Sequence, residues 1–240
     1  MSSVVIILLF GIGVSSANLL NHCDPERCSD LSPLEELEDV KFLPSEEDLK
    51  RICPSFLKYI DCEMDNVKEC NGVGIEELAL SPNRTIAGLS SLLLNIGSLA
   101  ADICDENTVL HQDYVTSVDC FKEHKENLFG DECSTESRKL ALGFYEFVKL
   151  SENVENAELA TCMETPLEIA CIAHLFQKNC GLKARRTFLT IAERIEKADP
   201  ECEYENFGNL KRAFLEYVNL SDDQKEIYQL VLDMLIQRRR

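Results

Sequence analysis

Cysteine is the residue type in this chain whose number and spacing point most directly to chemistry. Twelve cysteines fall into two blocks of six: Cys23, Cys28, Cys53, Cys62, Cys70 and Cys104, then Cys120, Cys133, Cys162, Cys171, Cys180 and Cys202. Each block contains a close trio, Cys53-x8-Cys62-x7-Cys70 and then Cys162-x8-Cys171-x8-Cys180. An even cysteine count behind an apolar leader is typical of a disulfide framework, and the Cys-x2-Cys spacing of zinc sites does not occur. We therefore expect twelve structural half-cystines, whose pairing the sequence leaves open, and no metal site.

The leader is residues 1–17, which we interpret as a signal peptide. Val4–Val14 is an apolar run of about eleven residues, and the small residues Ser15 and Ala17 favour cleavage between Ala17 and Asn18. This run is too short to span a bilayer, and we expect no membrane span in the rest of the chain either. The sequence therefore predicts a secreted, extracellular mature chain of residues 18–240.

The charge balance narrows the choice of partners. The chain has 43 Asp and Glu against 24 Lys and Arg, a formal net charge of −19. A surface with this charge repels the phosphate backbone of nucleic acids. We expect no nucleic-acid partner, and we expect the partner to be an extracellular protein or a small apolar ligand.

Apolar residues recur at helical spacing along most of the chain. From Ile86 they are spaced by three or four residues, at Leu89, Leu93, Ile96, Ala100 and Ile103. A second stripe consists of Leu140, Phe144, Phe147 and Val148. We expect an all-α, disulfide-crosslinked multi-helix domain, with two tandem halves (18–110 and 111–205) and a helical tail (206–240) as a possible subdivision.

Helix borders are marked by their own residue types. Thr165 followed by Pro166 predicts a helix start, and Gly181 predicts its end. Ser221 with Gln224 predicts a capping box before a closing helix.

Helix geometry limits how the cysteines can pair. Cys171 and Cys180 lie nine residues apart on one predicted helix. Nine residues advance about 13 Å along the axis and end on the opposite face. A disulfide needs Cα atoms within roughly 7 Å, so these two cysteines cannot bond each other. The same holds for Cys53 and Cys62 if their helix begins at Pro54.

Sites for enzymatic chemistry are not apparent in the sequence. There is no Gly-x-Ser-x-Gly, His-Glu-x-x-His, phosphate-loop or EF-hand motif. The four histidines are scattered: His22, His111, His124 and His174. Oxidised cysteines leave no thiol nucleophile. We predict a non-enzymatic protein without a cofactor, glycosylated at the sequons of Asn83 and Asn219.

The stretch from Cys53 to Cys202 resembles the arthropod 27 kDa haemolymph glycoprotein family. The resemblance lies in Ile52-Cys53-x8-Cys62-x7-Cys70, in Leu92-Leu93-Leu94 running to Cys104, in Cys120-Phe121-Lys122 with Cys133, in Cys162-x8-Cys171 with Phe176 and Cys180, and in Cys202. The segment after Cys202 is longer than this family pattern. The resemblance implies a secreted, helical, disulfide-linked glycoprotein of haemolymph or a gland secretion, without catalytic residues.

Two non-enzymatic functions fit these observations. The first is binding of another extracellular molecule through an acidic helical surface. The alternative is a carrier that holds a small apolar ligand in a helical cavity, or a venom component. An apolar cavity of several hundred Å³ would favour the carrier, whereas carboxylates converging in a cleft would favour an enzyme.

Overall fold

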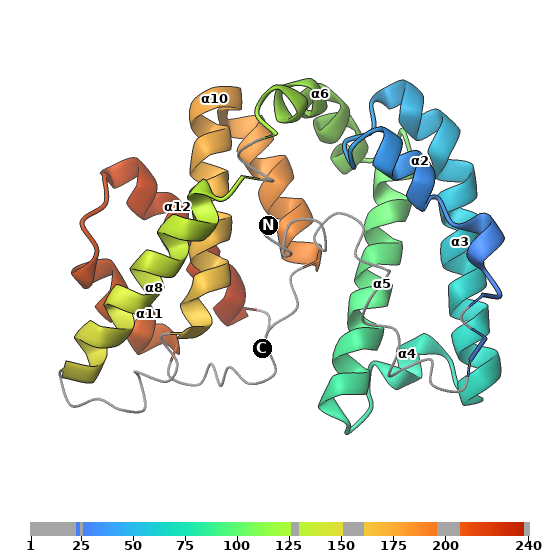
Figure 1. The fold of residues 1–240 in the computed structure, drawn as a ribbon, viewed down its shortest axis with the longest axis horizontal. Coiled ribbons are helices and arrows are strands. Elements are labelled where there is room, and N and C mark those ends of the chain that lie inside the picture. Colours follow the sequence, from blue (N-terminus) through green and yellow to red (C-terminus); the bar gives the residue numbers. More distant parts are fainter. Residues whose placement is uncertain (1–22, 25, 126–129, 151–160, 196–206, 238–240) are drawn as a thin grey trace. The chain divides into compact units, whose positions relative to one another are not determined.

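The computed structural model describes residues 23–24, 26–125, 130–150, 161–195 and 207–237, and no strand occurs among them (Figure 1). The predicted all-α class is confirmed. The helices are α2 (Leu34–Asp39), α3 (Glu46–Asn71), α4 (Ile75–Leu78), α5 (Arg84–Cys104), α6 (Val109–Glu123), α8 (Glu132–Leu150), α10 (Glu164–Ile195), α11 (Phe207–Tyr217) and α12 (Asp222–Gln237), with 3₁₀ turns η2 (Ser29–Leu31) and η3 (Thr161–Met163). The predicted leader, with its cleavage position at Ala17 and Asn18, lies outside the described residues, as do His22 and Cys202.

The helices belong to two compact units. The N-terminal unit contains η2 to α6. The C-terminal unit contains α8, η3, α10 as far as Glu193, α11 and α12.

The N-terminal unit is built on α3. Ser45 caps this helix: the backbone N–H of Asp48 donates to Ser45 Oγ, and the N–H of Ser45 donates to the Asp48 carboxylate at 2.9 Å. The helix ends at Gly72, whose φ of 73° is the left-handed conformation that glycine adopts without strain. Its buried face includes Leu49, Ile52, Phe56 and Ile60, spaced by three or four residues.

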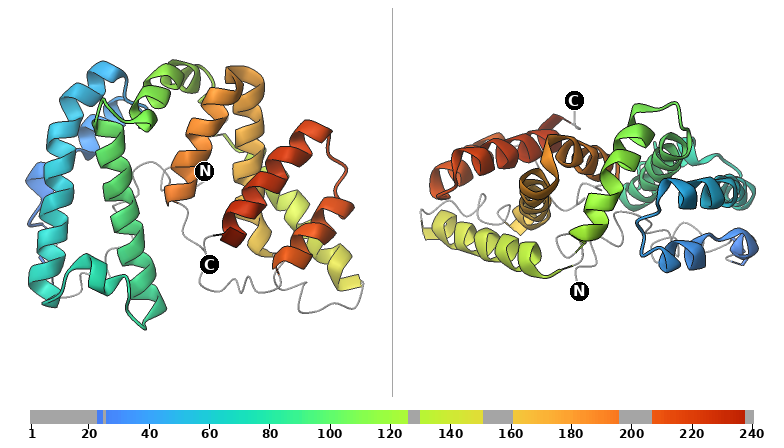
Figure 2. Two further views of the ribbon diagram at one scale, coloured as in Figure 1. Left: turned by 180° about the vertical axis from the view of Figure 1, so that it is seen from behind. Right: turned by 90° about the horizontal axis from the view of Figure 1, so that it is seen from above.

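α5 runs antiparallel to α3, and α4 crosses the end of this hairpin (Figures 1 and 2). Ile96 and Ala100 of α5 pack with Ile52, Phe56 and Ile60 of α3 in one apolar core. The stripe predicted from Ile86 onward therefore forms a helix that faces the core.

Disulfides tie this unit together. The pairs are Cys23–Cys70, Cys28–Cys62 and Cys53–Cys104, with Cα atoms 5.2, 6.0 and 5.5 Å apart. Cys53 and Cys62 bond different elements, as predicted. Each bond constrains the unfolded chain, by about 2–4 kcal/mol for a loop of ordinary length.

In the C-terminal unit, Cys133 of α8 bonds Cys171 of α10, with Cα atoms 5.6 Å apart. The prediction that Cys171 does not bond Cys180 is confirmed. Cys133 and Cys171 are the second and fourth cysteines of their block, and Cys28 and Cys62 hold the same ranks in theirs. Cys120, Cys162 and Cys180 are disulfide-bonded as well.

Aromatic side chains fill the core of the C-terminal unit. Phe144 of α8 packs edge-on against Phe214 of α11, with ring centroids 5.3 Å apart, and Phe214 stacks on Tyr228 of α12. Ser221 and Gln224 form the predicted capping box before α12. Phe147 differs from the prediction: its side chain is 49% exposed, although it belongs to the apolar stripe of α8.

Gly181 interrupts α10. Its φ of 84° and ψ of 179° lie outside helical geometry, and the chain turns back there (Figures 1 and 2). The predicted end of a helix at Gly181 is confirmed as a break between two helical segments.

One predicted helix start is wrong. Pro54 lies inside α3, because the Ser45 capping box lies nine residues before it and starts that helix. The start predicted at Thr165 and Pro166 agrees with the structure to within two residues, since α10 begins at Glu164.

α5 also departs from the expectation about membrane segments. Among the described residues it is long and apolar enough, by length and composition alone, to cross a membrane. Core helices of soluble proteins meet the same test, and α5 carries the bond to Cys53 of α3. The absence of a membrane span stays a prediction.

Candidate functional site: an apolar pocket in the N-terminal unit

A small apolar pocket lies between α2, α3, α5 and α6. Its volume is about 30 Å³, and its lining consists of Leu37, Phe42, Pro44, Leu49, Ile52, Cys53, Phe56, Ile96, Leu99, Ala100, Ile103, Cys104 and Tyr114. The lining includes one hydroxyl group, that of Tyr114, and this group donates to the carbonyl oxygen of Pro44 at 3.0 Å. Because this donor is already used, the pocket offers an incoming group mainly apolar contacts.

Helix periodicity places two walls of the pocket. Leu49, Ile52 and Phe56 recur on one face of α3, and Ile96, Ala100 and Ile103 recur on one face of α5. The Cys53–Cys104 bond joins these walls and is itself part of the lining.

The turn after α2 forms a third wall. The N–H of Phe42 donates to the carbonyl of Leu37 at 2.7 Å, and the N–H of Lys41 donates to that of Glu38 at 2.9 Å. These two bonds define a Schellman motif, in which the residue after the helix end takes the left-handed conformation. Lys41 has a φ of 53° and Phe42 a φ of 58°, where glycine is usually found. The motif turns Phe42 back toward Leu37, so both residues line the pocket.

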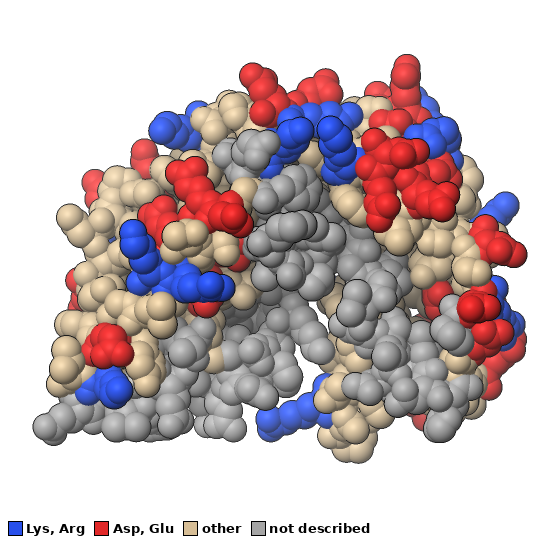
Figure 3. Space-filling view, viewed as in Figure 1, with Lys and Arg blue, Asp and Glu red and all other residues tan. Residues whose placement is uncertain are grey.

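The unit around the pocket is strongly acidic. Residues 23–78 contain sixteen Asp and Glu against six Lys and Arg, a net charge of −10. Acidic side chains gather over α2 and the first turns of α3 (Figure 3). Some are paired: Arg51 binds Glu36 at 2.7 Å and Lys50 binds Glu46 at 2.8 Å. Among the described residues, the exposed carboxylates of Glu35, Glu38, Asp39 and Glu47 have no ion pair.

Hydrogen bonds and ion pairs keep three carboxyl groups of α3 ionised. Hydrogen bonds from the side chain and backbone of Ser45 lower the pKa of Asp48. The hydrogen bond from Lys50 lowers the pKa of Glu46, and that from Arg27 lowers the pKa of Glu69. A carboxyl group that acts as a general acid near neutral pH needs a raised pKa, whereas the pKa values of these groups are lowered. These groups contribute negative charge, and we assign no proton transfer to them.

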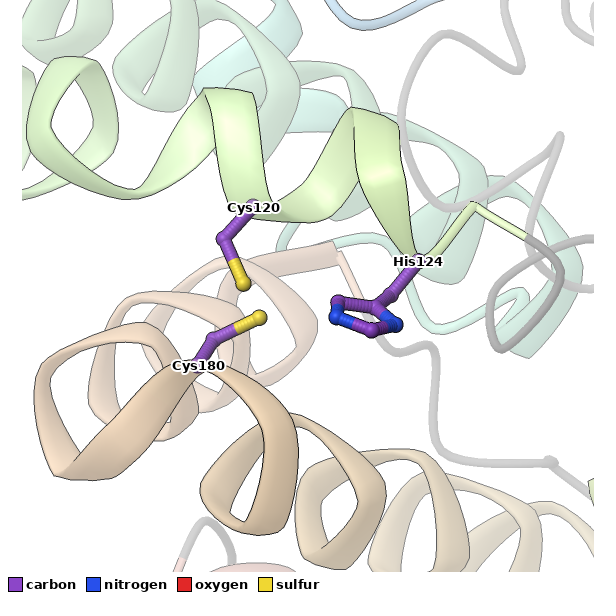
Figure 4. Close-up of side chains that lie close together, drawn as sticks. All are labelled: Cys120, His124 and Cys180. Carbon is purple, nitrogen blue, oxygen red and sulfur yellow. The ribbon is translucent and has the colours of Figure 1, made fainter.

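Cys120, His124 and Cys180 have the atom types of metal ligands (Figure 4). Metal binding by cysteine requires the thiolate, and both cysteines are disulfide-bonded. We therefore build no metal site on these three residues.

The other predicted site residues lie apart from the pocket lining. Asn83 and Asn219 are exposed, as their predicted glycosylation requires. His111 is buried, and its Nδ1 lies 2.6 Å from the carbonyl oxygen of Ile103. His174 is half-buried on α10. Neither histidine gives a nucleophile and base arrangement with a described neighbour.

Sequence reasoning did not find the pocket. Its lining comes from four helices and the α2–α3 turn, and cysteine spacing carries no information on whether packed helices leave a space between them. No protein-family model matches this chain, and neither a curated protein nor a solved structure matches it.

Proposed function

We propose that this chain is a secreted, non-enzymatic extracellular glycoprotein of haemolymph or a gland secretion, and that it acts by binding another molecule at the pocket of the N-terminal unit. The pocket carries the proposal, because an apolar space whose lining offers few free polar groups is a feature that binding sites share. The Cys53–Cys104 bond keeps its two main walls together.

The pocket volume favours one of the two kinds of binding. Cavities that enclose drug-sized or lipid-sized ligands measure about 300–1,000 Å³. The space found here is about 30 Å³, which suits the tip of one apolar side chain, a group of one or two heavy atoms. This favours a binding surface with a single anchoring pocket over a carrier that encloses its ligand.

The cysteines support an oxidising compartment. None of the described cysteines is free, and structural disulfides persist mainly outside the cytosol. Together with the predicted leader and the exposed sequons, this supports secretion.

Xenon tests whether the pocket accepts an apolar group, because it enters apolar cavities without needing hydrogen bonds. The oxidised full chain is labelled at isoleucine methyl groups and its spectrum is recorded under xenon. We expect shifts at Ile52, Ile96 and Ile103, which line the pocket. Ile169 and Ile227 of the C-terminal unit are buried elsewhere and serve as internal controls. Equal shifts in both groups, or none, would remove the basis of the proposal.

A further inference from the structure

We infer that the pocket receives an apolar side chain carried on a cationic peptide or protein segment. This inference rests on the proposed function, because it names the class of partner that the same pocket selects. It follows from the combination of an apolar space and an acidic surround in one small unit.

The carboxylates belong to the same turn as the pocket wall. Glu38 and Asp39 stand between Leu37 and Phe42, and both of the latter line the pocket. Glu38 and Asp39 are exposed and have no ion pair among the described residues, so their charge faces solvent uncompensated. Lys41 is the one cation within this turn.

A third carboxylate, that of Asp48, lies on α3. Asp48 lies close enough to Tyr114 for its charge to add to burial in raising the pKa of the Tyr114 hydroxyl. Tyr114 is part of the lining. Asp48 is also ion-paired with Arg51 at 3.3 Å, so the uncompensated negative charge beside the pocket comes from Glu38 and Asp39.

These two properties select a partner by different means. An apolar side chain filling a desolvated pocket supplies affinity, in the manner of an interface anchor. Opposite charge around the rim raises the association rate and excludes acidic competitors. A neutral apolar ligand would use only the first property, and a polycation without an anchor only the second.

Four short peptides separate these contributions: Lys-Lys-Leu-Lys-Lys, Lys-Lys-Ser-Lys-Lys, Ser-Ser-Leu-Ser-Ser and Glu-Glu-Leu-Glu-Glu, each blocked at both ends. They are titrated into the methyl-labelled full chain. We expect the lysine peptide with leucine to bind about tenfold tighter than the serine peptide with leucine, and to lose most of that advantage between low and high salt. We also expect it to shift Ile52 and Ile96.

A matched pair of variants locates the charge effect. Glu38→Gln with Asp39→Asn removes two carboxylates beside the pocket. Glu76→Gln with Glu77→Gln removes two exposed carboxylates from α4, at the other end of the α3–α5 hairpin (Figure 1). The first variant should weaken binding of the lysine–leucine peptide about threefold, and the second should leave it nearly unchanged.

The outcomes distinguish the inferred cationic partner from the proposed binding at the pocket. Equal affinity for all three leucine peptides would overturn the cationic partner while leaving the pocket as a binding site. Equal affinity of the two lysine peptides, without shifts at Ile52 and Ile96, would overturn the anchor. If xenon also leaves these methyl groups unshifted, the proposed function fails with it.

Discussion

Cys53 of α3 is bonded to Cys104 of α5, and the bonded pair forms part of the pocket wall. The bond closes a sequence separation of 51 residues and brings the two Cα atoms to 5.5 Å. One covalent link thus holds the helical hairpin and fixes the distance between the two faces that line the pocket. The shape of the pocket therefore depends on the oxidised state of the chain.

Lys41 occupies a position where glycine is expected to be more stable. At a φ of 53°, the Cβ atom of Lys41 costs energy that glycine avoids. Lys41→Gly should raise the free energy of unfolding by about 0.5–1 kcal/mol, measured by urea denaturation. Lys58→Gly is the control, because Lys58 is an exposed residue inside α3. It should lower the free energy of unfolding by about 1 kcal/mol, and equal effects of the two changes would contradict the assigned turn.

Asn83 combines a helix cap with a predicted glycosylation site. Its Oδ1 accepts hydrogen bonds from the N–H groups of Thr85 at 3.0 Å and Ile86 at 3.3 Å. The glycan would be attached to the other amide atom, Nδ2, so cap and glycan are compatible. Thr85→Ala and Asn83→Asp should each lower the intact mass of the secreted protein by one glycan while keeping the cap.

The free energies of unfolding of these variants distinguish the effect of the helix cap from the effect of the glycan. Asn83→Ala removes both the cap and the glycan. Its free energy of unfolding should be about 1 kcal/mol lower than that of Asn83→Asp, which keeps the cap. Identical masses for the wild-type chain and Thr85→Ala would show that the sequon is unused.

The order of the bonds in the first block of six cysteines predicts the remaining pairs in the second block. In the first block the first cysteine bonds the fifth, the second bonds the fourth and the third bonds the sixth. In the second block, the second again bonds the fourth. If the halves are related by duplication, the first and fifth, and the third and sixth, cysteines of the second block also pair. Proteolysis without reduction, followed by mass spectrometry, identifies the linked peptides, and a bond between the first and third would speak against duplication.

Asp48 makes the stability of α3 depend on pH. Its pKa is lowered in the folded state, chiefly by hydrogen bonds from Ser45, whereas an unfolded Asp titrates near pH 3.9. The stabilisation is therefore present above about pH 4 and is lost as the pH falls through the lower pKa of the folded state. Asp48→Asn should be less stable than the wild-type chain at pH 7, with a difference that narrows toward pH 3. Asp61→Asn, an exposed change on the same helix, controls for net charge. A gap that persists unchanged at pH 3 would rule out ionisation as its source.

Sequence patterns predicted features that are set within a few residues. The α5 stripe, the Ser221–Gln224 capping box and the break at Gly181 depend on local spacing or on one conformational preference. The exclusion of a bond between Cys171 and Cys180 followed from helix geometry alone.

Features that depend on distant residues were not predictable in this way. α3 extends through Pro54 because a strong cap lies upstream and the proline side chain is exposed. The turn after α2 uses Lys41 where a sequence search looks for glycine. The pocket needs Leu37, Ile52, Ile96 and Tyr114 to meet, and no periodicity within one helix encodes how closely four helices pack.

Filling the pocket from within is the most direct test of the claim that it admits an apolar group. Ala100 lines the pocket and is 3% exposed, while Ala141 of α8 is equally buried and lies outside it. Valine carries the same helix penalty at both positions, so Ala141→Val controls for propensity and crowding.

The measurement is the xenon-induced shift of the Ile52 and Ile96 methyl groups, taken together with the midpoint of urea unfolding. Ala100→Val should abolish the shifts and be at least about 1 kcal/mol more stable than Ala141→Val, which should keep the shifts in full. If Ala100→Val costs as much stability as Ala141→Val and leaves the xenon shifts unchanged, the space does not admit an apolar group and the account is contradicted.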